Sequence, residues 1–300
     1  MKRLHRKRDA AALSSRLIRR PIQRMVWLFL LPTFAAFCIG FLYPFLKGAF
    51  LSFCKFKLTS QWTWVGFSNY VKAFSDSTFV HAFWYTALFA FVSVLFINVL
   101  AFAVAYFLTK GIKGSNLFRT VFFMPNLIGG VVLGYIWSIL LNCVLSLLAK
   151  PLLRLDATYG FWGLILLMCW QQIGYMMIIY IAGLQSIPND YLEAAYIDGA
   201  NSWQTLWRVK IPNVMPSITI CLFLTLTNSF KLFDQNLALT GGEPAHMTEM
   251  LALNIYNTFY GRSGAQWKGY GQAKAVIFCV LVIVISMIQL RATRSKEVQQ

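Results

Sequence analysis

Six long apolar runs constrain this chain more strongly than any other feature of its sequence. They cover residues 26–49, 84–108, 118–142, 160–184, 214–237 and 272–290. Each run can cross a hydrocarbon core of about 30 Å as a helix of about 20 residues. Runs of this kind form helices because lipid offers no hydrogen-bonding partner to an open backbone. The sequence therefore predicts an all-α polytopic membrane protein with six transmembrane helices.

The charge distribution favours contact with a membrane surface over contact with nucleic acid. Only 12% of the residues are charged and 58% are hydrophobic, whereas soluble domains contain about a quarter charged residues. Nine Lys and Arg residues fall within the first 24 positions, with no aromatic residue among them. Such a segment is typical of a cytoplasmic flank beside anionic lipid. The six cysteines have no C-x-x-C spacing, which indicates small buried apolar residues rather than disulfides or metal ligands.

Basic residues in the flanks of the runs predict the orientation. Besides the N-terminal group, they are Lys110, Lys113, Arg119, Arg208, Lys210, Arg291, Arg294 and Lys296. The positive-inside rule then places both termini in the cytoplasm. We expect a basic cytoplasmic tail over residues 1–25, a membrane domain over 26–291 and a cytoplasmic tail over 292–300. The first run has no small-residue cleavage site after it and is expected to remain as an anchor.

The segment between the fourth and fifth runs, residues 186–213, predicts a bent pair of short helices on the cytoplasmic side. It contains the stretch EAAYIDGANSWQTLWRVKIP. Asp190 and Glu193 resemble a capping box at a helix start. Gly199 offers a helix stop because glycine takes the left-handed conformation without penalty. Ser202 is expected to cap a second helix that ends at Pro212.

An apolar stripe on the second of these helices indicates a packing surface. Its members recur at helical spacing and are Trp203, Leu206, Trp207 and Ile211. An amphipathic helix lying on lipid should carry basic residues on its polar face, but Asp190, Glu193 and Asp198 make the first helix acidic. Docking into a groove of a partner protein and packing against the chain's own helices remain open on spacing alone.

The same segment resembles the EAA loop of permease subunits from binding-protein-dependent ABC importers. The resemblance rests on Glu193-Ala194-Ala195, Asp198-Gly199-Ala200 and Ile211-Pro212. It extends over most of the chain through VGFSNYVKAF at 65–74, FRTVFFMPNLIGGVVLGYIW at 118–137, LTGGEP at 239–244 and GYGQAKA at 269–275. These segments resemble the first of the paired permeases of carbohydrate importers, similar to the maltose and glycerol-phosphate systems. The chain departs from the family pattern at Leu206 and Ile211, where both residues remain apolar.

This resemblance implies a type I ABC importer permease fold in a bacterial cytoplasmic membrane. The implied partners are a second homologous permease, a cytoplasmic ATPase dimer and an extracytoplasmic binding protein that delivers a carbohydrate. The implied ATPase-coupling residues are Glu193, Ala194, Ala195, Asp198, Gly199, Trp203, Leu206, Ile211 and Pro212. The chain itself contains no G-x-x-x-x-G-K-[ST] motif. ATP and Mg²⁺ are therefore expected on the ATPase, with no cofactor, no metal site and no catalytic residue in this chain.

Polar residues inside the runs are candidates for the solute path, because ionisable groups are costly in a membrane. They are Asn228, Lys231, Asp234 and Gln235 in the fifth run, Gln171 in the fourth and Asn126 in the third. Lys231 and Asp234 are three residues apart and are expected to pair on one helical face. A purely interfacial or helix-linking role is the alternative. A transporter driven by an ion gradient is the main rival function, although it needs coupling carboxylates and usually an inverted repeat.

Overall fold

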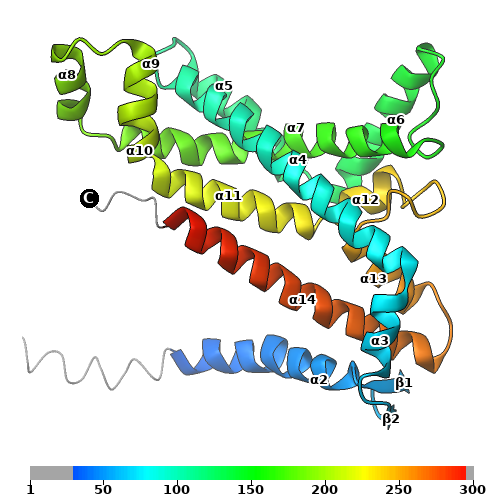
Figure 1. The fold of residues 1–300 in the computed structure, drawn as a ribbon. Helices are drawn as coiled ribbons and strands as arrows, with labels where there is room; N and C mark the ends of the chain where they lie inside the picture. Colours follow the sequence, from blue (N-terminus) through cyan, green and yellow to red (C-terminus); the bar gives the residue numbers. More distant parts are fainter. Residues whose placement is uncertain (1–29, 295–300) are drawn as a thin grey trace, which may run out of the picture.

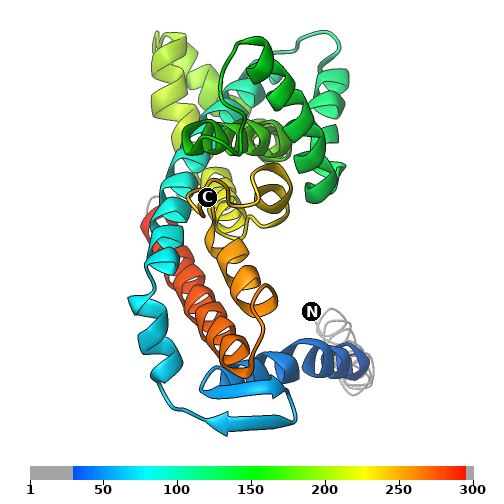
Figure 2. The same cartoon turned by 90° about the vertical axis from the view of Figure 1, so that its right-hand side faces the viewer.

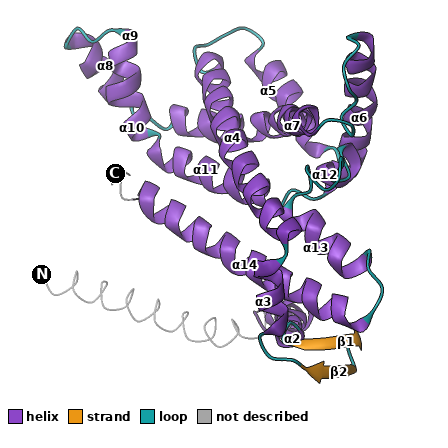
Figure 3. Ribbon diagram, turned by 45° about the vertical axis from the view of Figure 1, so that its right-hand side comes forward, coloured by secondary structure: helices purple, strands orange, loops and turns teal. Residues whose placement is uncertain are grey.

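The computed structural model describes residues 30–294 as an almost entirely helical bundle (Figures 1 and 3). The predicted basic tail, residues 1–25, lies outside the described residues, as does most of the C-terminal tail. Figure 3 shows the only strands of the described range at one end of the bundle. They form an antiparallel hairpin of β1 (Cys54–Leu58) and β2 (Gln61–Trp64). The sequence predicted no strands, so this hairpin corrects the all-α description in a minor way.

Five helices of the described range are long and apolar enough to cross a membrane. They are Leu30–Leu51, which ends in α2 (Tyr43–Leu51), α4 (Ser77–Leu108), α6 (Gly130–Leu147), α7 (Ala157–Gln185) and α14 (Ala265–Arg294). A sixth span results if the segment Ser202–Asn213 and α11 (Met215–Phe230), bent by 70° to each other, are taken together. The predicted class of a polytopic helical membrane protein is confirmed.

The third predicted run is broken into two helices rather than forming one span from 118 to 142. α5 (Ser115–Phe123) leads into a short 3₁₀ turn, Met124–Leu127, and α6 begins only at Gly130. Pro125 lies inside this turn and cannot donate a backbone hydrogen bond. Pro125 thus interrupts the third run, and the membrane-spanning helix begins about a dozen residues later than predicted.

The fifth predicted run also ends early. α11 stops at Phe230, and a separate short helix, α12 (Asp234–Leu239), begins after a three-residue break. The remaining helices are α3 (Ser68–Ser75), α8 (Asn189–Ile197), α9 (Ser202–Thr205), α10 (Ile211–Asn213) and α13 (Leu251–Tyr260). A π-helical stretch, Leu206–Lys210, joins α9 to α10. The predicted fifth run is therefore two separate helices, and polar side chains lie around the break between them.

α7 is the most buried of the membrane-spanning helices, and the first helix is, together with α6, the least buried. Within its apolar span, 67% of the residues of α7 are buried, against 11% for Leu30–Leu51. Figure 2 shows this first helix extending away from the rest of the molecule. Such an apolar surface requires cover by lipid or protein.

Polar side chains connect the core helices α4, α7 and α11. The amide of Asn98 donates to Thr225 Oγ1 at 2.9 Å, and the hydroxyl of Tyr180 donates to Asn98 Oδ1 at 2.7 Å. All three side chains are buried. Interhelical hydrogen bonds of this kind hold membrane helices together where the hydrophobic effect does not distinguish neighbour from lipid.

Gly174 allows α5 to approach α7 closely. A Cβ atom at this position would lie 1.8 Å from the backbone oxygen of Phe122. No side-chain rotation can relieve a clash with backbone, so only glycine is compatible with this packing. The approach fixes the break at Pro125 next to the middle of α7.

A buried ion pair, which the sequence analysis did not predict, joins the start of α4 to α14. Lys274 Nζ lies 2.9 Å from Asp76 Oδ2, and the lysine side chain is only 1% exposed. Asn254 and Thr258 of α13 accept the other hydrogen bonds of the ammonium group. Burial alone would raise the pKa of Asp76, but hydrogen bonds from Tyr270, Lys274 and Thr78 outweigh it and hold this pKa well below its usual value.

Candidate functional site

A bent helical hairpin projects from one end of the bundle (Figure 1). Its first arm is α8 and its second arm is the segment from α9 to α10, with Gly199 between them. Gly199 has a φ of +73°, and the amide of Ala200 donates to the carbonyl oxygen of Ala195 at 2.9 Å. This is the hydrogen-bonding pattern of a helix that ends on a left-handed glycine. The predicted bend at Gly199 is confirmed.

Three local predictions about this hairpin are wrong. α8 follows Pro188 with no side-chain cap, so Asp190 and Glu193 form no capping box. The second arm is capped by Asn201 rather than Ser202. The side chains of Asn201 and Gln204 each accept a hydrogen bond from the other residue's backbone amide, at 2.8 and 2.9 Å. Pro212 does not end the arm, because a proline is tolerated in the first turn of α10, which continues to Asn213.

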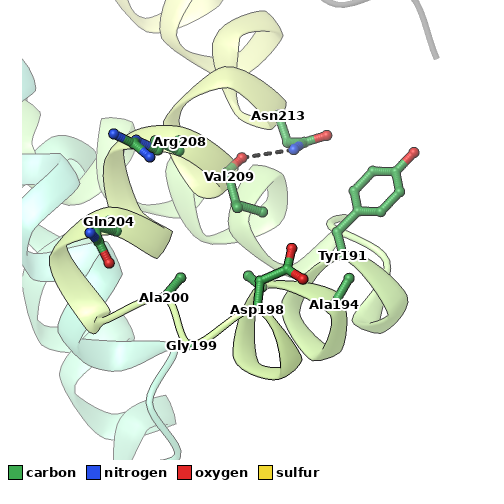
Figure 4. A pocket seen from close by; sticks show the side chains of 10 residues that line it. Tyr191, Ala194, Asp198, Gly199, Ala200, Gln204, Arg208, Val209 and Asn213 are labelled. Atoms are coloured by element: carbon green, nitrogen blue, oxygen red, sulfur yellow. Dashed lines mark hydrogen bonds between the residues drawn. The ribbon is translucent and has the colours of Figure 1, made fainter.

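A cleft of about 590 Å³ separates the two arms (Figure 4). Its lining residues are Tyr191, Ala194, Ala195, Asp198, Gly199, Ala200, Gln204, Arg208, Val209 and Asn213. On the second arm, Asn213 donates to the carbonyl oxygen of Val209 at 2.7 Å. Four of the predicted coupling residues, Ala194, Ala195, Asp198 and Gly199, thus lie around one concave surface. Glu193 is exposed on the same helix as the two alanines.

The apolar stripe of the second arm faces the bundle instead of this cleft. All four members of the stripe, Trp203, Leu206, Trp207 and Ile211, line a second, largely apolar cleft of about 740 Å³ against α4. Phe102 and Tyr106 of α4 form its opposite wall. Trp203 and Trp207 are 66% and 54% exposed, so the stripe faces α4 across an open cleft, and docking of a partner and packing against the chain's own helices both remain open.

Sequence reasoning missed the most exposed apolar side chains of the hairpin. Tyr196 and Ile197 are 84% and 82% exposed at the end of α8. They lie between Ala195 and Asp198, beside the bend. The signal that could have identified them is a pair of large apolar residues at the end of a short acidic helix.

A polar cavity of about 400 Å³ lies where α11 ends and α12 begins. Its lining residues are Met168, Gln172, Asn228, Lys231, Leu232, Phe233, Asp234 and Gln235. The four candidate residues of the predicted fifth span are thus brought together at one cavity. Gln172, Met168 and Phe233 were not among the predicted site residues.

Hydrogen bonds connect this cavity to α7 and to the break before α6. Gln235 donates to Gln171 Oε1 at 2.7 Å, and Gln171 donates to the carbonyl oxygen of Ile128 at 3.3 Å. Asn228 donates to Gln172 Oε1 at 3.4 Å. Gln171 does not line the cavity itself, but its hydrogen bond holds the side chain of Gln235, which does. Asn126 lies on the 3₁₀ turn Met124–Leu127 and does not line the cavity.

The predicted pairing of Lys231 with Asp234 is wrong. Lys231 caps the C-terminus of α11, whereas Asp234 lies in the first turn of α12. No ion pair joins them within residues 30–294. Each charge instead suits its own helix end, because a cation is favoured at a C-terminus and an anion at an N-terminus. The broken helix leaves both groups available to the cavity.

Comparison with known proteins identifies the family. Residues 97–296 match the family model described as "Binding-protein-dependent transport system inner membrane component". The chain is 42% identical over 286 residues to the "Probable starch degradation products transport system permease protein AmyD" of Thermoanaerobacterium thermosulfurigenes, covering 91% of this chain and 95% of that protein. It is 32% identical to the "Multiple sugar-binding transport system permease protein MsmF" of Streptococcus mutans, covering 91% and 96%.

The fold matches a solved importer as well. A chain of a bacterial ABC transporter involved in the import of the polysaccharide alginate superposes with a TM-score of 0.79. The match covers 93% of this chain and 98% of that one, at 23% identity. The predicted ABC importer permease fold is thereby confirmed, together with the resemblance found in the EAA segment. The chain therefore belongs to the family of inner membrane components of binding-protein-dependent transport systems.

Proposed function

We propose that this protein is the permease subunit of an ATP-driven importer that takes up an oligosaccharide delivered by an extracytoplasmic binding protein. The observation that carries this proposal is the exposed, glycine-bent hairpin at one end of a membrane bundle. Relatives named for starch degradation products and for multiple sugars support the carbohydrate class. The chain lacks a P-loop, so we assign ATP hydrolysis and Mg²⁺ binding to separate ATPase subunits.

We infer that the hairpin docks into the ATPase and that this end of the bundle is cytoplasmic. α14 ends on the same side as the hairpin (Figure 1), which agrees with a cytoplasmic C-terminus. Tyr196 and Ile197 provide the exposed apolar contact, and Glu193 provides a negative charge for a basic partner group. A second permease would cover the exposed first helix, Leu30–Leu51, and complete a central path.

The polar cavity is the proposed solute contact. A sugar presents a ring of hydroxyls and weakly apolar faces, so it requires amides, a few charges and an aromatic surface. Asn228 and Gln235 supply amides, and Lys231 and Asp234 supply charges. Phe233 supplies the ring. These groups sit between the ends of two helices, the arrangement that membrane transporters use for binding solutes near mid-membrane.

Transport then follows from a change in population between two states of the bundle. ATPase closure moves the hairpin arms, and the clefts on both sides of the second arm leave room for such movement. A ligand shifts a two-state equilibrium only by its difference in affinity for the two states. ATP must therefore favour the outward-facing state by a few kcal/mol to invert the populations.

Uptake by the reconstituted complex tests the proposed function. The permease pair, ATPase and binding protein are placed in proteoliposomes with labelled α-1,4-linked glucose oligomers outside. Uptake should require internal ATP and the binding protein, and it should persist when proton and sodium gradients are collapsed. Uptake that follows an ion gradient without ATP would support the rival secondary transporter instead.

Substituting Asp234→Leu together with Gln235→Leu should reduce uptake in this assay by at least tenfold. The change removes a charge and an amide from the cavity and leaves Gln171 without its donor. Assembly is checked by co-purification of all subunits. Leu237→Ala on the exposed part of α12 is the matched control and should transport normally. Undiminished uptake by the double variant would remove the cavity from the solute path.

A further inference from the structure

Four aromatic rings form a continuous series that extends beyond the polar cavity; three are on α13, and the fourth is Phe233, between α11 and α12. Ring centroids are separated by 5.1 Å between Phe233 and Tyr256 and by 5.0 Å between Tyr256 and Tyr260. Phe259 lies 4.8 Å from Tyr260. Tyr256 and Tyr260 are four residues apart, so they occupy the same face of α13. The series therefore runs from the end of α13 to the break between α11 and α12.

These rings line a cavity of about 370 Å³ that adjoins the polar cavity. Its lining residues are Phe233, Ala252, Ile255, Tyr256, Phe259, Tyr260, Gly271, Gln272 and Ala275. Phe233 lines both cavities. Phe233, the last ring of the series, is therefore also part of the wall of the polar cavity proposed to bind sugar.

The outer rings are exposed rather than packed into the core. Tyr256 is 41% exposed and Tyr260 is 71% exposed. Within residues 30–294, neither phenol hydroxyl makes a hydrogen bond to protein. Figure 2 shows α13 on the open side of the bundle, facing the space beside the first helix. Exposed rings with free polar tips in a concave surface are typical of a ligand-binding site.

We propose that Tyr260, Tyr256 and Phe233 form an aromatic ladder along which successive sugar rings of an oligosaccharide stack before entering the polar cavity. This inference rests on the proposed carbohydrate function and adds residues to it. The apolar C–H faces of a pyranose lie flat on an aromatic ring, and its hydroxyls stay at the ring edges. Tyrosine suits this role because its hydroxyl can bond the sugar while its ring provides the surface.

The ladder makes a prediction that depends on substrate length. A disaccharide can occupy the polar cavity alone, whereas a longer oligomer extends over the rings of α13. Loss of the outer rings should therefore affect long substrates more than short ones. A purely structural role for the rings would affect all lengths equally.

Uptake of an α-1,4-linked glucose disaccharide and pentasaccharide by the complete complex, with saturating binding protein, tests this ladder. Tyr256→Leu with Tyr260→Leu should lower pentasaccharide uptake about two- to tenfold, the range expected for lost ring contacts, with a smaller effect on the disaccharide. Tyr256→Phe with Tyr260→Phe keeps the rings and should retain most of the pentasaccharide uptake. Tyr135→Leu, an exposed tyrosine on α6 that lines neither cavity, controls for the substitution itself.

Two outcomes would overturn the ladder. One is unchanged pentasaccharide uptake by the double leucine variant. The other is an equal loss for both lengths accompanied by dissociation of the second permease, which would identify the rings as a subunit interface. Failure of the wild-type complex to transport either oligomer would instead overturn the proposed function, and the ladder with it. The wild-type measurement therefore separates the two failures.

Discussion

Gly199→Val should reduce ATP-driven uptake at least tenfold while the complex stays assembled in the membrane. Gly199 has a φ of +73°, a conformation that costs an ordinary L-residue about 1–2 kcal/mol and a β-branched residue more. A Cβ atom at this position would meet nothing within 4 Å. The effect must therefore arise from the backbone bend and the direction of α8, with no contribution from a clash. Uptake and ATP hydrolysis are measured in proteoliposomes, and assembly by co-purification.

Gly199→Asn is the matched control for this experiment. Asparagine adopts the left-handed region more readily than other non-glycine residues, and the open space around Gly199 accommodates its side chain. We expect this variant to transport at a rate close to that of the wild type, with ATP hydrolysis still linked to uptake. Normal transport by the valine variant would show that the bend has no part in coupling. Loss of assembly in the valine variant would assign the glycine a purely structural role.

Asp76→Ala should destabilise the protein by about 3–5 kcal/mol, the cost of leaving a buried charge without its partner. Lys274 is almost fully buried and would keep only the neutral acceptors Asn254 and Thr258. The substitution also removes the side-chain cap of α4, because Asp76 accepts a hydrogen bond from the backbone amide of Thr78. Thermal unfolding of the detergent-purified complex measures the loss, which should appear as a lower Tm and a reduced amount in the membrane.

The double variant Asp76→Ala with Lys274→Met separates charge from packing. Methionine keeps an unbranched apolar side chain in the space of the lysine and removes the unpaired ammonium. Its Tm should lie above that of Asp76→Ala alone, because the two substitutions affect the same pair and are not additive. Lys55→Met, at an exposed position of β1, should change stability by less than about 0.5 kcal/mol. A double variant no more stable than Asp76→Ala would show that the pair contributes no charge coupling.

Much of the architecture could be predicted from the sequence because lipid imposes a single local rule. Long apolar runs must satisfy their own backbone hydrogen bonds, so their existence and helical type follow from composition and length alone. The bend at Gly199 is similarly local, since it depends on one residue's allowed backbone conformations. The EAA segment and its family were likewise recognisable from residue identities at fixed spacing.

Other features depended on contacts between residues far apart in the chain. Sequence placed Asn228, Lys231, Asp234 and Gln235 on one helix, whereas the structure breaks that helix and gathers these residues at a cavity with Gln172. A continuous apolar pattern does not reveal where a helix is interrupted, because the freed backbone and polar groups find partners on other helices.

The buried pair of Asp76 and Lys274 and the ring series on α13 illustrate the same limit. Asp76 and Lys274 are almost two hundred positions apart, and each is ordinary in its own local sequence. The free energy that allows Lys274 to be buried comes from a carboxylate that only the packing of α14 against α3 brings within 2.9 Å. The sequence by itself determined which segments are helical and where the hairpin bends, since both follow from local backbone rules. Only the tertiary structure decided which polar and aromatic groups meet, since such meetings depend on how distant helices pack.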